Sequence, residues 1–296
     1  MTSKASHSQG LLLFKLHNGH PFALGTLKIR ELVPYQPVTS MINSPAGVVG
    51  AVNIRGQTLP ILDMAAIIGY GAIPEDRLKD SYILVTDCQR KTVGFLVDGI
   101  ERIVDADWKH IQSPPKSLGG QVFITGTTEV NGEIIQLMDV ELLLSMVYSG
   151  DTNHLDVAIT DIEREKLKPL KILVVDDSVT ARKQLTDVLS HLNIPFEVTD
   201  NGSHALEIMR EKAKWGEPID LLVSDIEMPG LDGYELTFEV RNDTTLKDAY
   251  IILHTSLSSE ISVGQAHQVG ANEALEKFDA RNLIDAMLVG ADSLNK

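Results

Sequence analysis

Carboxylate, hydroxyl and ammonium side chains recur where apolar, strand-like segments end in the second half of the chain. Asp176 and Asp177 follow one such segment, and Asp225 follows another. Thr255 and Lys277 come after two more. Carboxylates gathered in apolar surroundings repel one another, so they need a cation between them. Oxygen ligands that leave positions for water suit Mg²⁺, and the pattern therefore predicts a magnesium site.

Five strands that alternate with helices would bring these side chains to one edge of a sheet. Strands this apolar are buried on both faces, which favours a parallel sheet covered by helices, and such sheets bind ligands at the carboxyl ends of their strands. Strands are predicted at 171–175, 196–199, 221–224, 250–254 and 273–276, with helices at 178–192, 205–214, 234–241, 261–268 and 280–288. Each aspartate alone has an alternative role as a helix cap. That alternative does not explain why all of these strand ends agree.

The first half of the chain predicts an all-β domain. Short apolar segments there are separated by Gly, Pro and polar turns, a spacing typical of a barrel or sandwich. A repeat with an offset of 76 residues relates 50–63 to 126–139. Each copy has two strands joined by a turn that ends in Gly, then an aspartate before an apolar helical stretch. We predict that these aspartates, Asp63 and Asp139, are N-caps, and that the repeat forms two similar sub-barrels. Examples of the expected strands are 11–16, 48–54, 58–62, 82–86, 93–97, 122–127 and 134–138.

Composition and charge narrow the class of protein. The 296 residues are 43% hydrophobic and 23% charged, which suits about two globular domains. Apolar runs are far shorter than the ~20 residues of a membrane span, so we expect a cytoplasmic protein with no direct membrane insertion. The single cysteine, Cys88, excludes an internal disulfide and a Cys-based zinc site. Residues 170–296 carry 22 Asp and Glu against 11 Lys and Arg, so we expect no nucleic-acid partner.

Motifs in the first half resemble the CheW coupling family over about residues 10–148. That resemblance implies two five-stranded barrels and two partners, chemoreceptor cytoplasmic tips and the chemotaxis histidine kinase. It places Arg55 on a receptor-facing surface, although Arg55 is equally well a charge in a hairpin turn. The motifs are Arg30-Glu-Leu-Val-Pro34, Gly47-Val48, Asn53-Ile-Arg-Gly56, Pro60-Ile-Leu-Asp63, Ile124-x-Gly126 and Gly132-x-Ile-Ile-x-Leu-x-Asp139.

The second half resembles the receiver domain of two-component response regulators over residues 170–290, with Met228-Pro-Gly-x-Asp-Gly233 after Asp225 as a characteristic loop. The resemblance implies a flavodoxin-like (βα)5 fold. It also implies that the kinase's phosphohistidine phosphorylates Asp225 and that Mg²⁺ binds there. By the same resemblance the Mg²⁺ ligands are Asp177, Asp176 through water, Asp225 and the Glu227 backbone carbonyl, while Thr255 and Lys277 contact the phosphoryl group. Two positions depart from the family pattern: Ala274 replaces the usual switch aromatic and Phe278 the usual proline.

A short polar segment separates the halves, so we predict a coupling domain at 1–149, a linker at 150–169 and a receiver at 170–296. Thr160 and Glu163 match a capping box, which favours a short helix over 161–168; a flexible charged tether is the alternative.

These features together resemble the hybrid coupling proteins of bacterial chemotaxis. We therefore expect a cytoplasmic adaptor at chemoreceptor arrays, whose coupling changes on phosphorylation and which acts on no external substrate. The alternative is a phosphate sink that drains phosphoryl groups from the kinase. A metal-dependent phosphatase is disfavoured because Ser178 occupies the second acidic position of its Asp-x-Asp motif. A DNA-binding regulator is disfavoured because no basic reading helix follows the receiver.

Overall fold

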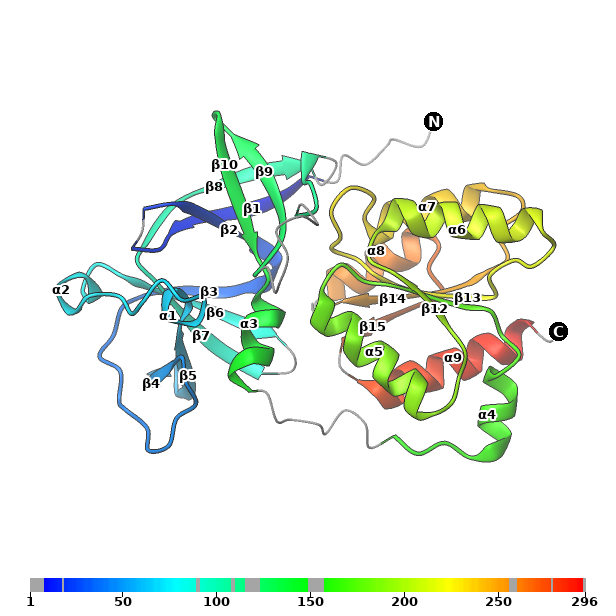
Figure 1. Ribbon diagram of the computed structural model, residues 1–296, viewed down its shortest axis with the longest axis horizontal. Coiled ribbons are helices and arrows are strands. Elements are labelled where there is room, and N and C mark those ends of the chain that lie inside the picture. Colours follow the sequence, from blue (N-terminus) through cyan, green and yellow to red (C-terminus); the bar gives the residue numbers. More distant parts are fainter. Residues whose placement is uncertain are drawn as a thin grey trace. The chain divides into compact units, whose positions relative to one another are not determined.

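The computed structural model of the chain is shown in Figure 1. It describes residues 8–17, 19–88, 91–107, 110–114, 123–148, 157–255, 260–277 and 279–294. The chain divides into two compact units, Met1–Gly150 and Asp151–Lys296. No helix in the described ranges has the length and apolar character that crossing a bilayer requires.

The first unit consists of two five-stranded sheets, as predicted. One sheet has the order β8-β1-β2-β10-β9 and the other β3-β6-β7-β5-β4. The first contains β8 (Gly99–Asp107), β1 (Ser8–Lys15), β2 (Pro21–Gly25), β10 (Glu133–Met138) and β9 (Ile124–Val130). The second contains β3 (Ile29–Pro34), β6 (Tyr82–Cys88), β7 (Lys91–Val97), β5 (Gln57–Asp63) and β4 (Val48–Ile54). Short helices connect them: η1 (Thr26–Lys28), α1 (Met64–Ile67), α2 (Glu75–Leu78) and α3 (Val140–Val147).

The sequence repeat corresponds to a repeated structural unit. In each copy an antiparallel hairpin, β4–β5 or β9–β10, adds its second strand parallel to a strand of another hairpin. Each copy then enters a helix through the predicted cap: the Asp63 carboxylate accepts the Ala66 amide at 3.0 Å, and that of Asp139 accepts the Leu142 amide at 2.9 Å. The cap predictions are therefore confirmed.

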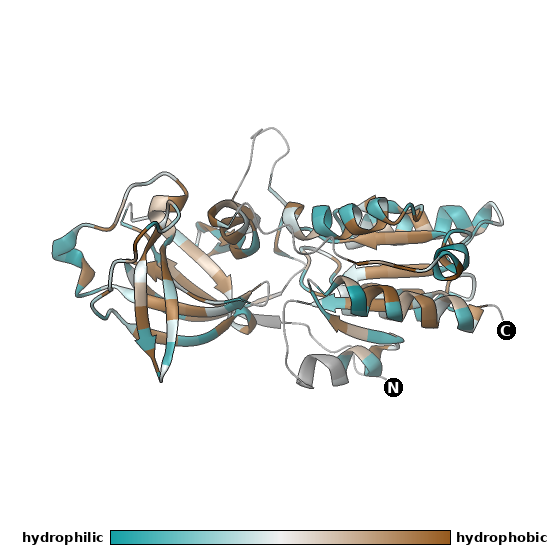
Figure 2. Cartoon of the chain, turned by 90° about the horizontal axis from the view of Figure 1, so that it is seen from below, coloured by the Kyte–Doolittle hydropathy of each residue, from teal (hydrophilic) through white to brown (hydrophobic). Residues whose placement is uncertain are grey.

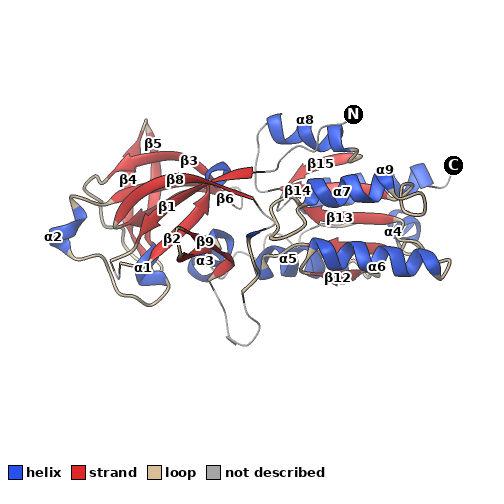
Figure 3. Cartoon of the chain, turned by 90° about the horizontal axis from the view of Figure 1, so that it is seen from above, coloured by secondary structure: helices blue, strands red, loops and turns tan. Residues whose placement is uncertain are grey.

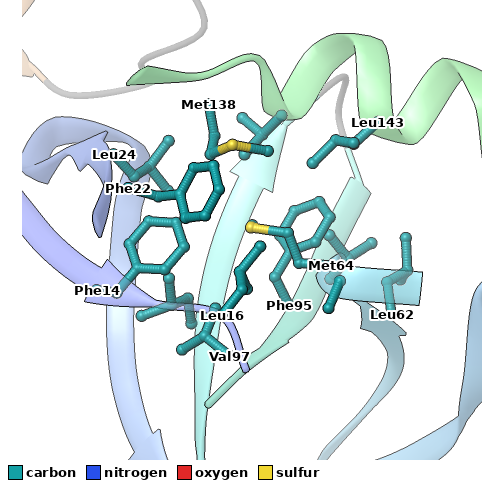
Figure 4. Packing of buried hydrophobic residues seen from close by; sticks show 14 of the residues in the cluster. Phe14, Leu16, Phe22, Leu24, Leu62, Met64, Phe95, Val97, Met138 and Leu143 are labelled. Carbon is teal, nitrogen blue, oxygen red and sulfur yellow. The ribbon is translucent and has the colours of Figure 1, made fainter. Parts of the chain in front are cut away.

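One apolar core joins the two sheets of this unit. Phe14 and Phe22 of the first sheet lie with their ring centroids 6.1 Å apart, and Phe95 and Met64 approach from the second sheet and its helix, as Figure 4 shows. Leu143 of α3 packs on the same cluster. The helices that follow the two hairpins thus help to close a core shared by both copies of the repeat.

Three strands of the first unit, β2, β3 and β8, are not among those named from the sequence. Strand β8 reads Gly-Ile-Glu-Arg-Ile-Val-Asp-Ala-Asp, and its charged residues interrupt the apolar pattern by which strands are recognised. Residue 122, predicted to begin a strand, lies outside the described residues.

The second unit is a parallel sheet between two layers of helices, which confirms the predicted fold class. Figure 2 shows apolar strands between helices whose outer faces are hydrophilic, and Figure 3 shows the same layers by element type. The strand order is β12-β11-β13-β14-β15. The strands are β11 (Ile172–Val175), β12 (Glu197–Thr199), β13 (Leu221–Asp225), β14 (Tyr250–Thr255) and β15 (Glu273–Glu276). One face is covered by α6 (Gly202–Lys214), α7 (Gly233–Asn242) and α8 (Glu260–Val269), and the other by α5 (Val179–His191), α9 (Ala280–Leu294) and α4 (Asp161–Leu167).

Gly50 provides a test of how tightly the first unit is built. It has a φ of +148°, and a methyl group added there would overlap the carbonyl oxygen of Thr39, which forms an isolated β-bridge with Ala51. We expect Gly50→Ala to lower the free energy of unfolding by about 3 kcal/mol, because it adds a backbone clash to the strain. Gly56→Ala is the matched control: φ there is +85° with no atom within 4 Å, so it should cost only about 1 kcal/mol. Equal losses in denaturant unfolding would contradict this account.

Candidate functional site

The parallel register places the predicted acidic residues at one edge of the second sheet. Strand β11 pairs Val175 with Ser224 of β13, so Asp176 and Asp225 emerge side by side. On the other side of β13, Asp225 is opposite His254, and Thr255 follows at the end of β14. The site therefore lies at the carboxyl ends of the central strands, where parallel sheets bind ligands.

Three carboxylates converge at this edge. Asp176, Asp177 and Asp225 each offer an oxygen within 4.8 Å of the other two. The ammonium group of Lys277 lies 2.9 Å from Asp176 Oδ2 and 2.9 Å from Asp225 Oδ2. Asp176, Asp225 and Lys277 are at most 3% exposed, so this ammonium and these two carboxylates have little water to separate them.

Backbone amides fix the second oxygen of two of these carboxylates. The Ser178 amide donates to Asp176 Oδ1 at 2.9 Å, and the Ile226 amide donates to Asp225 Oδ1 at 2.7 Å. Arg182, one turn inside α5, donates from Nη1 to the carbonyl of Asp176 at 2.5 Å. Sequence reasoning did not select Arg182; the available signal was a cation placed four residues after the N-cap Ser178, in the first turns of a helix beside an acidic pair.

The loop after Asp225 approaches its backbone closely, which requires glycine at one point. A methyl group added to Gly233 would overlap the Asp225 carbonyl, and the Gly233 amide donates to the Ile226 carbonyl at 2.9 Å. Asp232 then caps α7 by accepting the Glu235 amide at 2.7 Å. This loop therefore fixes the direction in which Asp225 leaves its strand.

The remaining predicted site residues fall in three places. Glu227 and Thr255 are buried, two residues after Asp225 and at the end of β14, and the Lys277 amide donates to the Thr255 carbonyl at 2.7 Å. Arg55 belongs to the first unit. Its side chain, 81% exposed, pairs with Glu31 at 2.7 Å, and its φ of +50° fits the predicted hairpin turn.

Ala274, which replaces the usual switch aromatic, is partly buried against the core beneath α6–α8. The other departure from the family pattern, Phe278, lies outside the described residues.

Comparisons with known proteins match both halves of the chain. Residues 10–147 match the model of the CheW-like domain, and residues 172–288 match that of the response regulator receiver domain. The chain is 26% identical to "Chemotaxis protein CheV3" of Helicobacter pylori, over 92% of this chain and 90% of that protein. Two relatives from Rhizobium etli match one half each. "Probable chemotaxis protein CheW" is 32% identical over 46% of this chain and 86% of its own length, and "Probable chemotaxis protein CheY" is 36% identical over 36% and 81%.

Lys277→Met tests whether the ammonium group holds the carboxylates together. Because it leaves buried like charges without their cation, we expect it to lower the free energy of unfolding by about 3–5 kcal/mol. Adding Asp225→Asn removes one of those charges and should restore part of the loss. Urea unfolding followed by circular dichroism measures both. If the double variant is no more stable than Lys277→Met, lost packing rather than charge explains the effect.

Proposed function

We propose that this chain, which belongs to the CheW-like and response regulator receiver families, is a chemotaxis adaptor of the CheV type that couples chemoreceptors to the histidine kinase, and that phosphorylation of Asp225 modulates this coupling. One observation carries the proposal. A buried cluster of three carboxylates and one lysine lies in the same chain as a domain of the coupling family. A CheV protein is also similar to this chain over 92% of this chain and 90% of its own length.

The site is suited to accept a phosphoryl group at Asp225. The carboxylate forms an O–P bond while the N–P bond of the kinase phosphohistidine breaks, and the leaving imidazole takes up a proton. Lys277, 2.9 Å from Asp225 Oδ2, offsets negative charge on the transferring group. Thr255 lies buried at the neighbouring strand end, where its hydroxyl is placed to bind a phosphoryl oxygen. The domain would modify only itself and turn over no external substrate.

The donor set fits Mg²⁺. Oxygen atoms of Asp176, Asp177 and Asp225 lie within 4.8 Å of one another, and hard cations of this kind prefer carboxylate and carbonyl oxygens. Lys277 alone leaves the cluster with excess negative charge. We propose these three residues and the Glu227 carbonyl as the ligands, with Asp176 acting through water. Bound there, Mg²⁺ supplies positive charge toward the phosphoryl oxygens.

The first unit would supply the contacts with chemoreceptor tips and with the kinase. Arg55 is the residue we propose for the receptor-facing surface, because its exposed guanidinium lies at a hairpin turn where a partner can reach it. The protein would work in the cytoplasm at the receptor arrays. Under this proposal, phosphorylation of Asp225 in the second unit changes how the first unit couples the receptor to the kinase.

Asp225→Asn tests the acceptor directly. An amide cannot form the acyl phosphate, so we expect phosphorylated kinase to label the wild-type chain and not the variant. Chelation of Mg²⁺ should abolish labelling of the wild type. In reconstituted complexes of receptor, kinase and this protein, only the wild type should change kinase activity on phosphorylation. Undiminished labelling of the variant would refute the assignment of Asp225.

The phosphoryl lifetime separates a modulator from a phosphate sink. Glu227 is buried two residues after the acceptor, where its carboxylate can crowd the water that attacks the phosphoryl group. Leu257, two residues after Thr255 in the sequence, lies outside the described residues. We expect a persistent phosphoryl group in the wild type and severalfold faster loss in Glu227→Asn, measured by intact mass. Glu207→Asn, on an exposed position of α6, is the control. A half-life of seconds that Glu227→Asn leaves unchanged would favour the sink.

A further inference from the structure

The segment Val157–Leu167, here called the strap, lies against the second unit. Val157 and Ile159 pack on the core beneath α5 and α9, and Leu167 is fully buried there. Figure 1 shows α4, the helical part of the strap, beside α9. In the sequence the strap comes directly before β11. It therefore separates the segment that leads from the first unit from the strand that Asp176 follows.

Two sets of polar contacts hold the strap, one at each end. At its carboxyl-terminal end, here called the lower end, Lys166 pairs with Asp292 in the last turn of α9 at 2.7 Å, and Arg164 Nε donates to the Leu192 carbonyl at 3.1 Å. At its amino-terminal end, residues 157–163, here called the upper end, Arg281 of α9 makes the polar contacts described next. That guanidinium donates to the Ala158 carbonyl at 3.3 Å and lies 3.3 Å from Glu163 Oε1.

Glu163 links the upper tie to the helix cap. Its Oε2 accepts the Thr160 amide at 2.7 Å and the Thr160 hydroxyl at 2.8 Å, while the Glu163 amide donates back to that hydroxyl at 3.2 Å. The Thr160 amide, then its hydroxyl and to a lesser extent Arg281, lower the pKa of Glu163. Because the pKa of Glu163 is lowered in the folded chain, its carboxylate is ionised at neutral pH. Protonation would therefore break the cap and the tie only in acid.

Arg281 has a second partner on its own helix. Its Nη2 lies 2.6 Å from Asp285 Oδ1, shorter than either contact with the strap. A small movement of the first turn of α9 therefore lets the guanidinium keep Asp285 and release the strap. The upper tie therefore has two alternative states, with Arg281 either on both Asp285 and the strap or on Asp285 alone.

The first turn of α9 is joined directly to the acidic site. Arg281 comes four residues after Lys277, whose ammonium lies 2.9 Å from Asp225 Oδ2 and whose amide donates to the Thr255 carbonyl. Asp279 between them starts the helix by accepting the Asn282 amide at 3.0 Å. A phosphoryl group on Asp225 would offer new oxygens to the Lys277 ammonium, which now contacts Asp225 Oδ2, and in the switch proposed below the resulting shift of Lys277 reaches the helix start.

Resting on the function proposed above, we propose that phosphorylation of Asp225 releases the upper half of the strap, residues 157–163, from Arg281, while Lys166 and Leu167 keep the lower half docked. Once released, residues 157–163 would add up to about 23 Å of extended chain between the docked part of the strap and the first unit. Phosphorylation would thus change the reach of the coupling domain without any change within it.

Hydrogen exchange of the full-length chain, treated with Mg²⁺ and acetyl phosphate, tests this. We expect the Glu163 and Arg164 amides, which donate to Thr160, to exchange at least tenfold faster in the phosphorylated wild type. Asp225→Asn should show no change. Unphosphorylated Arg281→Gln should exchange as fast as the phosphorylated wild type.

Two further variants separate the switch from a general loss of structure. Lys166→Gln weakens only the lower end, so the response to phosphorylation should persist. Asp285→Asn removes the alternative partner of Arg281, so the response should shrink. Intact mass reports labelling of Asp225 in every sample. Full labelling with unchanged or stronger protection of these amides overturns the strap alone, whereas absence of labelling overturns the proposed function.

Discussion

The second unit depends on one buried interaction, the ammonium of Lys277 held between Asp176 and Asp225. Ionised groups with this little exposure are strongly destabilising unless they are paired, and the parallel register leaves the carboxylates no other position. The amides of Ser178 and Ile226 fix their remaining oxygens. The cluster is therefore organised before any ligand arrives, yet its charge is only partly compensated. Such a site gains stability from a divalent cation and reacts readily to a change in charge.

The same cluster explains the construction of the elements around it. Asp225 can leave β13 in the required direction only because Gly233 lets α7 begin against its carbonyl group. Lys277 reaches the cluster because β15 lies next to β14 and its backbone joins Thr255. The Lys277 backbone is thereby tied to the end of β14, and its side chain is tied to Asp176 and Asp225.

Local patterns predicted much of this architecture. Strands buried on both faces, the caps Asp63 and Asp139, and the strand-end carboxylates all leave signals within a few residues of sequence. Strand β8 was not named from the sequence because charged residues interrupt its apolar pattern. The tie between Arg281 and Glu163 was missed for a different reason: the pair is 118 residues apart, and nothing near either residue indicates its partner. The sequence predicted a capping role for Glu163, but its contact with α9 is a tertiary property.

A regulated connection has to be weak as well as specific. Exposed ion pairs contribute about 0.2–1 kcal/mol each, and the Arg281–Glu163 pair, with side chains 49% and 25% exposed, belongs to this class. A signal can shift an equilibrium only by its own difference in free energy between the two states, and allosteric coupling is typically about 1–3 kcal/mol. The exposed Arg281–Glu163 pair is weak enough for coupling of this size to break, whereas Leu167 is fully buried. Under the proposed switch, this division of the strap into a weak end and a firm end would let a charge at Asp225 release the connection without unfolding the second unit.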